Sequence, residues 1–345
     1  MTANSKKIPE SVRIWKLRFS LIIVFIVSVL IVGILNIIPV RSTQVLLELD
    51  LDEFVAEGSA EFKLVNLQAD YLNIAMLDTL DVPAQQYLVG NQENNLRPFT
   101  KLAPFEPLRL SPRSDVWNVS ASSEYLGLNL QIHANSSLRF FSKSTSNGDF
   151  RMELLGGDLN GHVDTGDDVL LHCNNCLLSD DPERVQIVKA MMLWEELKFR
   201  SRNGKMQLRA ELSNNTKDIV IKNIEADSLH FIKDLDQETT IIGGTITFPE
   251  LDGVSVILRD GDYLTAHPKN SFRIRNIKIN ENITLLVQGE VVEIKTGIPD
   301  YMYSRMPTWY EWISTNRKTQ FLTSSIVGLM TVILGILYKL KFLEK

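Results

Sequence analysis

The sequence contains few of the residues and motifs on which enzyme chemistry usually depends. Among 345 residues it has two cysteines and five histidines. None of the G-x-S-x-G, H-E-x-x-H, P-loop or G-x-G-x-x-G patterns occurs in it. His133, His230 and His267 are isolated, and no spacing arranges them into a triad. We therefore predict that the protein is not an enzyme and that it has no catalytic residues and no cofactor.

Charge is absent from two long stretches of the sequence. Residues 19–40 contain only Ser20, Ser28 and Asn36 as polar side chains. As a helix rising about 1.5 Å per residue, this stretch would cover roughly 30 Å, the thickness of a hydrocarbon core. Residues 320–338 form a second uncharged stretch. The two stretches predict two transmembrane helices, because a helix satisfies its own backbone hydrogen bonds in lipid.

Each of these stretches has one alternative interpretation. Residues 19–40 could be a cleaved signal peptide, but their apolar run exceeds the usual length of about 7–15 residues. The residues that follow, Ile-Ile-Pro-Val-Arg-Ser, also lack an A-x-A-like cleavage site. Residues 320–338 could be a buried core helix, but an aromatic cluster precedes them, as is typical of a membrane span. We prefer two uncleaved anchors.

Basic residues are concentrated at the two ends of the chain. Residues 1–18 carry five basic residues and one acidic residue, and residues 339–345 carry three and one. The rest has 28 basic and 40 acidic residues. Basic flanks stay in the cytoplasm, so we predict a plasma (inner) membrane protein with both termini cytoplasmic and residues 41–319 periplasmic or extracellular. An acidic domain also argues against nucleic acid as a partner.

The long central part of the chain has the pattern of β-strands. Val45, Leu47, Leu49 and Leu51 alternate with polar residues, which is typical of a half-buried strand. β-branched residues and regularly spaced turn residues continue this pattern as far as Ile294. We predict a membrane-anchored, mainly β protein whose residues 41–298 form a large antiparallel, sandwich- or repeat-like domain. The proline-rich residues 90–115 mark a candidate boundary within it.

Three dipeptides predict hairpin turns between alternating segments. They are Asn147-Gly148, Asn203-Gly204 and Asp260-Gly261, whose composition suits turns with positive φ. The segments around the first two are similar in sequence. That similarity indicates either a repeated β unit or chance resemblance between amphipathic hairpins.

One segment has the pattern of a soluble helix. Asp181-Pro182-Glu183 offers an N-cap, a proline at the first helical position and an acid in the first turn. Val185, Val188 and Met192 then recur at helical spacing. We expect one helix here, covering an end or a face of the sheet.

Cys173 and Cys176 lie in VLLHCNNCLLS, where Asn174-Asn175 favours a tight hairpin turn. We predict a disulfide between these cysteines, because thiols this close oxidise outside the cytoplasm. Two free thiols or a redox pair are the alternatives, and thioredoxin-type chemistry would need a helix N-terminus. His162, His172, Cys173 and Cys176 could also supply four metal ligands. Adjacent His172 and Cys173 point to opposite faces of a strand, however, so we predict no metal site.

The run GGDLNGHVDTGDD, residues 156–168, mixes acids and glycines as calcium-binding loops do. When Asp158 is counted as position one, Gly161 falls at position four instead of six, which breaks the EF-hand spacing. We interpret this run as a solvated loop between strands.

Aromatic residues crowd into the segment 299–319, just before the second predicted span. Rings with one polar edge settle at the level of lipid headgroups. We predict that they form an interfacial belt, with a partner-binding patch as the alternative. The five residues are Tyr301, Tyr303, Trp309, Tyr310 and Trp312.

These patterns favour an anchored module that binds other proteins. Our first hypothesis is a structural or interaction module of an envelope or membrane complex, with the lipid bilayer and membrane or envelope proteins as partners and with the capacity to form a homo-oligomer. The second is lipid or amphiphile binding and transfer in an apolar groove, which strands over 241–294 would line. The third is an extracytoplasmic hydrolase or redox enzyme, which would require a cleft with convergent polar groups.

Overall fold

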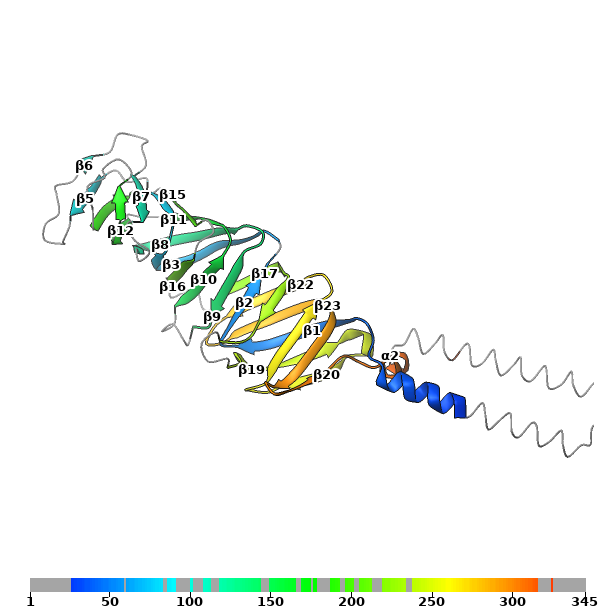
Figure 1. Ribbon diagram of the computed structural model, residues 1–345. Coiled ribbons are helices and arrows are strands. Elements are labelled where there is room, and N and C mark those ends of the chain that lie inside the picture. The colour runs from blue at the N-terminus through cyan, green and yellow to red at the C-terminus, as the bar shows by residue number, and fades with distance from the viewer. Residues whose placement is uncertain are drawn as a thin grey trace, which may run out of the picture. The chain divides into compact units, whose positions relative to one another are not determined.

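The structure is a computed structural model, and its strands and helices are labelled in Figure 1. Two compact units are distinguished in it. Unit 1 comprises Met1–Thr43, Phe248–Val254 and Met306–Lys345, and unit 2 comprises Gln44–Thr247 and Ser255–Arg305. The structure describes residues 26–58, 60–82, 86–90, 100–101, 108–112, 118–143, 149–165, 169–174, 176–178, 187–192, 196–201, 205–212, 219–233, 238–315 and 324.

The larger of two antiparallel sheets has sixteen strands. Its main path runs β13-β7-β4-β15-β11-β8-β3-β16-β10-β9-β2-β18. The strands are β2 (Glu53–Glu57), β3 (Phe62–Ala75), β4 (Thr79–Val82), β5 (Gln86–Gly90), β6 (Thr100–Lys101), β7 (Leu108–Pro112), β8 (Asn118–Ile132), β9 (Ser137–Phe141), β10 (Phe150–Gly156), β11 (Leu159–Thr165), β12 (Val169–Asn174), β13 (Cys176–Leu178), β14 (Ile187–Met192), β15 (Glu196–Ser201), β16 (Met206–Leu212) and β18 (Ser228–His230).

The smaller sheet has eight strands in the order β17-β22-β23-β1-β19-β20, and β21 and β24 also pair with β23. The strands are β1 (Thr43–Leu51), β17 (Ile219–Ala226), β19 (Ile241–Phe248), β20 (Val254–Leu258), β21 (Tyr263–Pro268), β22 (Phe272–Ile279), β23 (Ile283–Ile298) and β24 (Tyr301–Ser304). The 3-10 helix η3 (Pro249–Leu251) follows β19, and the helix α2 (Trp309–Thr315) follows β24.

The predicted alternation of β1 is confirmed. Val45, Leu47, Leu49 and Leu51 are fully buried, whereas Glu48 and Asp50 are exposed. Because successive side chains of a strand point to opposite faces, this strand has one core face and one outer face. The mainly β prediction for the central part of the chain is confirmed as well.

Two strand pairs carry the chain from one sheet to the other. β1 belongs to the smaller sheet and β2 to the larger, with Asp52 between them. β17 and β18 are divided in the same way at Asp227. The Asp52 amide donates to the Thr240 carbonyl over 3.0 Å, and the Asp227 amide donates to the Glu57 carbonyl over 2.6 Å. A strand that bends out of one sheet therefore keeps its backbone hydrogen bonds in the next.

A continuous row of apolar residues crosses the larger sheet. Neighbouring strands place Phe54 opposite Phe140, Phe140 opposite Met152, and Met152 opposite Leu208. These side chains are at most 1% exposed, and the rings of Phe54 and Phe140 stack with centroids 5.2 Å apart. Cross-strand pairs of this kind stabilise a sheet by burying area on one face. The row continues through Ile74, Val119 and Cys173, which are also buried.

The larger sheet divides at β8. Along one side β8 pairs with β3. Along the other side, Asn118–Ser122 pairs with β12, and Leu126–Ile132 pairs with β11. One branch then continues through β15, β4, β7 and β13, and the other through β14, β5 and β6. The strands β5, β6 and β7 fall within residues 90–115 or next to them, so this proline-rich part contributes strands to both branches.

Only one of the three predicted glycine hairpins is present. β9 and β10 flank Asn147-Gly148 and pair with each other, as predicted. The prediction at Asn203-Gly204 is wrong, because β15 pairs with β11 and β4 whereas β16 pairs with β10 and β3. The prediction at Asp260-Gly261 is also wrong. Gly261 has a φ of 86° within a turn, but β20 belongs beside β19, and β21 pairs with β23. A turn dipeptide reverses the chain without selecting the strand's partner.

The helix predicted from Asp181 to Met192 is wrong where the structure describes it. Ile187–Met192 is the strand β14, which pairs with β12 on one side and β5 on the other. The cap residues 181–183 and Val185 lie outside the described residues. The β-branched residues Ile187 and Val188 lower the helix propensity of this segment. Its backbone hydrogen-bonding groups are satisfied by pairing with β12 and β5. Tertiary pairing therefore overrides a capping pattern.

The loop predicted for residues 156–168 is wrong over its central part. Leu159–Thr165 is the strand β11, paired with β8 and β15 on its two sides. Leu159, Gly161 and Val163 are buried, while Asn160 and His162 are half-buried on the other face. Glycine and acidic residues obscured an alternation that is present in the sequence.

In unit 1, the end of the first predicted span is hydrogen-bonded to the segment that precedes the second predicted span. The Val40 amide donates to the Pro307 carbonyl over 2.9 Å, and the Trp309 amide donates to the Ile38 carbonyl over 3.0 Å. Pro39 and Thr308 form an isolated antiparallel bridge between them. Residues 26–37 form a helix whose apolar side chains are exposed, among them Leu30 (59%) and Ile34 (54%).

No helix within the described residues has the length and apolar character needed to cross a bilayer. Residues 19–25 and most of the second predicted span, 320–338, lie outside the described residues.

A capping box begins α2. The Thr308 amide donates to Glu311 Oε2 over 2.8 Å, and the Glu311 amide donates to Thr308 Oγ1 over 3.3 Å. This reciprocal pair satisfies two donors at the helix start. Because Thr308 also forms the bridge to Pro39, the start of α2 is fixed beside the end of the helix over 26–37.

A partly buried carboxylate joins three strands of the larger sheet. Glu153 on β10 accepts from Arg151 over 2.6 Å and from Gln207 on β16 over 3.2 Å, and it lies 3.7 Å from Arg139 on β9. Its side chain is 9% exposed. We expect Glu153→Leu to lower the free energy of unfolding by about 3 kcal/mol, since charged partners lose their acceptor.

Urea unfolding of the full chain would measure this loss. The matched control is Glu211→Leu, because Glu211 lies exposed on the neighbouring strand β16. A similar midpoint shift in both variants would contradict a special role for the Glu153 cluster.

Candidate functional site

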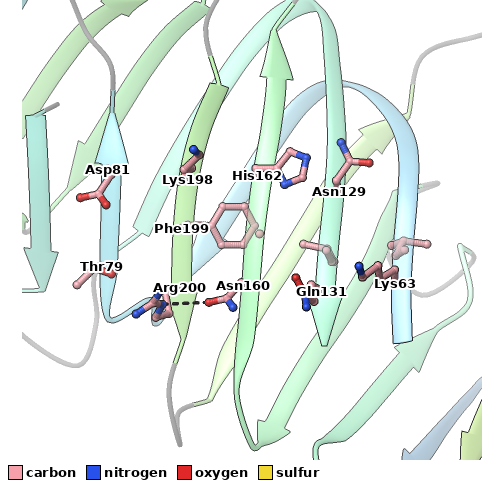
Figure 2. A pocket seen from close by; sticks show the side chains of 13 residues that line it. Lys63, Thr79, Asp81, Asn129, Gln131, Asn160, His162, Lys198, Phe199 and Arg200 are labelled. Atoms are coloured by element: carbon pink, nitrogen blue, oxygen red, sulfur yellow. Dashed lines mark hydrogen bonds between the residues drawn. The ribbon is translucent and has the colours of Figure 1, made fainter. Parts of the chain in front are cut away.

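Five adjacent strands of the larger sheet align a row of polar side chains on one face. Lys63 lies opposite Gln131, and Gln131 opposite Asn160. Asn160 in turn lies opposite Arg200, and Arg200 opposite Thr79. The strands are β3, β8, β11, β15 and β4 (Figure 2). With strands about 4.8 Å apart, the row is roughly 19 Å long.

A second polar row runs two residues further along the same strands. Asn129, His162, Lys198 and Asp81 lie opposite one another in that order on β8, β11, β15 and β4. The two rows border a cavity of about 740 Å³, and Figure 2 shows their labelled side chains. We call this cavity the polar groove. Its volume is typical of a small-molecule site.

Apolar residues alternate with the two polar rows. Leu64, Leu130 and Phe199 are at most 6% exposed, since they turn toward the buried face of the sheet. Gly161 lies opposite both Leu130 and Phe199, and a Cβ atom there would overlap the Phe199 ring. A glycine in the middle of a strand is therefore required for this ring to pack across the backbone.

Hydrogen bonds fix several side chains of the polar groove. Arg200 Nε donates to Asn160 Oδ1 over 3.0 Å, and the Asn160 amide nitrogen lies 2.7 Å from His133 Nε2. At the other end, Gln131 Nε2 donates to Glu61 over 2.5 Å. Amide groups held in this way present a fixed pattern of donors and acceptors to a ligand.

The polar groove is cationic on an acidic protein. Lys63, Lys198 and Arg200 line it against a single lining carboxylate, Asp81, whereas the chain as a whole carries a net charge of −6. Two further carboxylates lie just beyond the lining. Asp164 Oδ2 accepts from Asn129 over 2.9 Å, and Glu61 Oε1 accepts from Gln131 over 2.5 Å. A local positive field concentrates anions even when the whole protein repels them. The arrangement can bind an anion and offers hydroxyl groups many hydrogen-bonding partners.

The four weak metal-ligand candidates are not brought together. His162 lies in the polar groove, whereas His172 lies on β12. These histidines are opposite Asn129 and Ser120 of β8, which are nine residues and roughly 30 Å apart. Cys173 is fully buried on the face opposite His172. No cluster of three metal-binding side chains occurs among the described residues.

Cys173 is disulfide-bonded, and Cys176 is the only other cysteine in the chain. The hairpin predicted at Asn174-Asn175 is wrong, since β12 pairs with β8 and β14 while β13 pairs with β7. The two cysteines thus belong to the two branches of the divided sheet. A disulfide there closes a small loop, so its effect is local.

The five aromatic residues predicted for a membrane interface lie on two elements. Tyr301 and Tyr303 are on β24 and are 64% and 61% exposed. Trp309, Tyr310 and Trp312 are on α2, where the rings of Trp309 and Trp312 meet edge to face with centroids 5.7 Å apart. Trp312 Nε1 donates to Glu250 of η3 over 3.4 Å. Their place in a lipid interface stays a prediction.

The sequence patterns marked His162 only as a weak metal-ligand candidate and did not indicate the other residues of the polar groove. The alternation of Asn160 and His162, or of Lys198 and Arg200, is visible in the sequence. It was attributed to a solvated loop in the first case and a hairpin in the second. The missing information was the register between strands far apart in the chain.

Comparisons with known proteins give no guide to this site. No protein-family model matches the chain, and no curated protein matches it in sequence.

The contact between Gly161 and Phe199 generates a stability prediction. We expect Gly161→Ala to lower the free energy of unfolding by about 1–3 kcal/mol, because the added methyl group overpacks the ring. Thermal unfolding of the full chain measures the loss. Phe199→Leu in the Gly161→Ala background should restore part of it.

Gly156→Ala is the matched control, since Gly156 ends β10 of the same sheet and a Cβ there meets no atom within 4 Å. Equal effects of the two alanine substitutions would show that strand glycines, and not the ring contact, determine the loss.

Proposed function

We propose that this chain is a two-pass membrane protein whose β-rich part is an extracytoplasmic structural or interaction module of an envelope or membrane complex. The observation that carries the proposal is the hydrogen-bonded pairing of residues 38–40 with residues 307–309. This pairing holds the end of the first apolar segment next to the residues that precede the second apolar segment. Two helices starting from one place can enter one bilayer together.

The exposed surface of the helix over 26–37 supports insertion into lipid. Ile26, Leu30, Ile34 and Ile37 are 51–80% exposed there. In water such a surface is strongly unfavourable, whereas in hydrocarbon it is matched by the solvent. The basic ends then place both termini in the cytoplasm and residues 41–319 outside the plasma (inner) membrane. The aromatic residues of α2 and β24 suit the headgroup level.

Burial in the smaller sheet favours an interaction module over a lipid-transfer groove. Ile274, Leu285, Val287 and Val291 of β22 and β23 are fully buried in the core. Most apolar side chains of β22 and β23 therefore pack in the core, whereas Val254, Ile257 and Val292 are exposed singly and do not form a lined groove among the described pockets. The polar groove supplies the surface that this module would use to contact another molecule.

Epitope tags test the proposed topology. One tag is inserted in the exposed turn at Ala134-Asn135 and one follows Lys345. We expect external protease to remove the inserted tag from right-side-out membrane vesicles and to leave the C-terminal tag intact. Inverted vesicles should give the opposite result. Protection of the inserted tag in right-side-out vesicles would overturn the proposal.

Charged substitutions in the first apolar segment give a second test. Leu30→Arg with Ile34→Arg costs about 3 kcal/mol per residue for insertion at a helix centre. We expect this double variant to keep the inserted tag on the cytoplasmic side, so that protease no longer reaches it. Leu30→Ile with Ile34→Leu preserves apolarity and should leave the tag accessible. The same accessibility in both variants would rule out residues 19–40 as the translocating anchor.

A further inference from the structure

The spacing of the basic residues in the polar groove restricts the ligand it can hold. Lys63 and Arg200 belong to one row but are three strands apart, which is roughly 14 Å. One phosphate or carboxylate is too small to contact both side chains. A ligand that uses both must carry negative groups at separated positions.

Between these two cations the groove is lined by neutral amides. Gln131 and Asn160 lie between Lys63 and Arg200 in the first row, and Asn129 and His162 border them in the second. An amide both donates and accepts hydrogen bonds, as does a hydroxyl group. The middle of the ligand should therefore carry hydroxyl groups that reach these amides.

The position of the groove and its lining exclude two other classes of ligand. It crosses strands that are paired on both sides, so an extended peptide cannot add to the sheet there. Stacking with successive bases needs several exposed rings, but of the two rings in the lining Phe199 is 3% exposed and His162 is half-buried.

We propose that the polar groove binds an acidic oligosaccharide, with Lys63 and Arg200 contacting acidic groups on separated sugars and the amides contacting hydroxyl groups between them. Arg200 suits this role because its guanidinium can bind a carboxylate or phosphate through two hydrogen bonds. This inference goes beyond the proposed membrane topology and does not depend on it.

Direct binding to the full chain in a polyoxyethylene detergent tests the proposal. The probes are an oligogalacturonate of several sugar units, a neutral glucose oligomer of equal length, and polyphosphate. We expect calorimetry to detect binding of the oligogalacturonate that weakens with salt, and little binding of the other two. Equal binding of the neutral oligomer would overturn the role of charge. Equal binding of polyphosphate would overturn the saccharide class.

Charge reversal identifies the residues that bind. Lys63→Glu and Arg200→Glu should each weaken oligogalacturonate binding about tenfold, as expected for one charge-assisted contact. Their separation predicts additive effects, so the double variant should lose about a hundredfold. Lys222→Glu, an exposed residue of β17 in the other sheet, changes the net charge equally and should have no effect. Equal weakening by Lys222→Glu would reduce the effect to net charge and refute the site.

Two further measurements are needed. One distinguishes a loss of recognition from a loss of folding, and the other identifies whether the ligand is a free sugar chain or a lipid headgroup. Each variant should keep the melting temperature of the parent chain. If a glutamate variant both loses binding and melts at a lower temperature, the neutral variants Lys63→Gln and Arg200→Gln are measured in its place. Vesicles carrying an acidic glycolipid form the last arm. Binding of the soluble oligogalacturonate assigns recognition to the sugar chain, whereas binding confined to the vesicles would overturn the proposal.

Discussion

The register between strands is the constraint on which the larger sheet depends. Because side chains alternate along a strand, a shift of one residue would move every apolar side chain to the outer face. The actual register aligns Leu64, Leu130, Phe199 and Leu80 through Gly161 on one face. It also aligns the two polar rows of the groove on the other face. The same backbone hydrogen bonds thus determine both the core and the candidate site.

Local sequence patterns predicted those features that depend on a single strand. The alternation in β1 was sufficient, since buried Val45 and Leu47 need no knowledge of their partner. The β9–β10 hairpin was predicted because its strands are adjacent in the chain and share one short turn. The Asn203-Gly204 and Asp260-Gly261 turns failed for the converse reason. Each is followed by a strand whose best partner lies far away in the sequence.

Composition concealed two elements whose structure depends on neighbouring strands. β14 follows a residue pattern with helical caps, and only its pairing with β12 and β5 makes it a strand. β11 resembles a loop because Asn160, Gly161 and Asp164 interrupt its apolar residues. Its glycine is explained only when Phe199 of β15 is placed beside it. The polar groove could not be predicted for the same reason, since its residues come from five strands between Lys63 and Arg200.

The pairing of early and late strands has a consequence for biosynthesis. β1 emerges among the first strands, yet its partners are β19 and β23, whose residues follow it by about two hundred positions. Contacts so distant in sequence close slowly, and unpaired edges are prone to aggregation in the meantime. The apolar face of Val45, Leu47 and Leu49 therefore lacks its partner strands β19 and β23 until synthesis is nearly complete. A ribosome that stalls before Ile241 would release a nascent chain in which β1 has an unpaired edge and an exposed apolar face. Such a chain is a substrate for quality-control proteases.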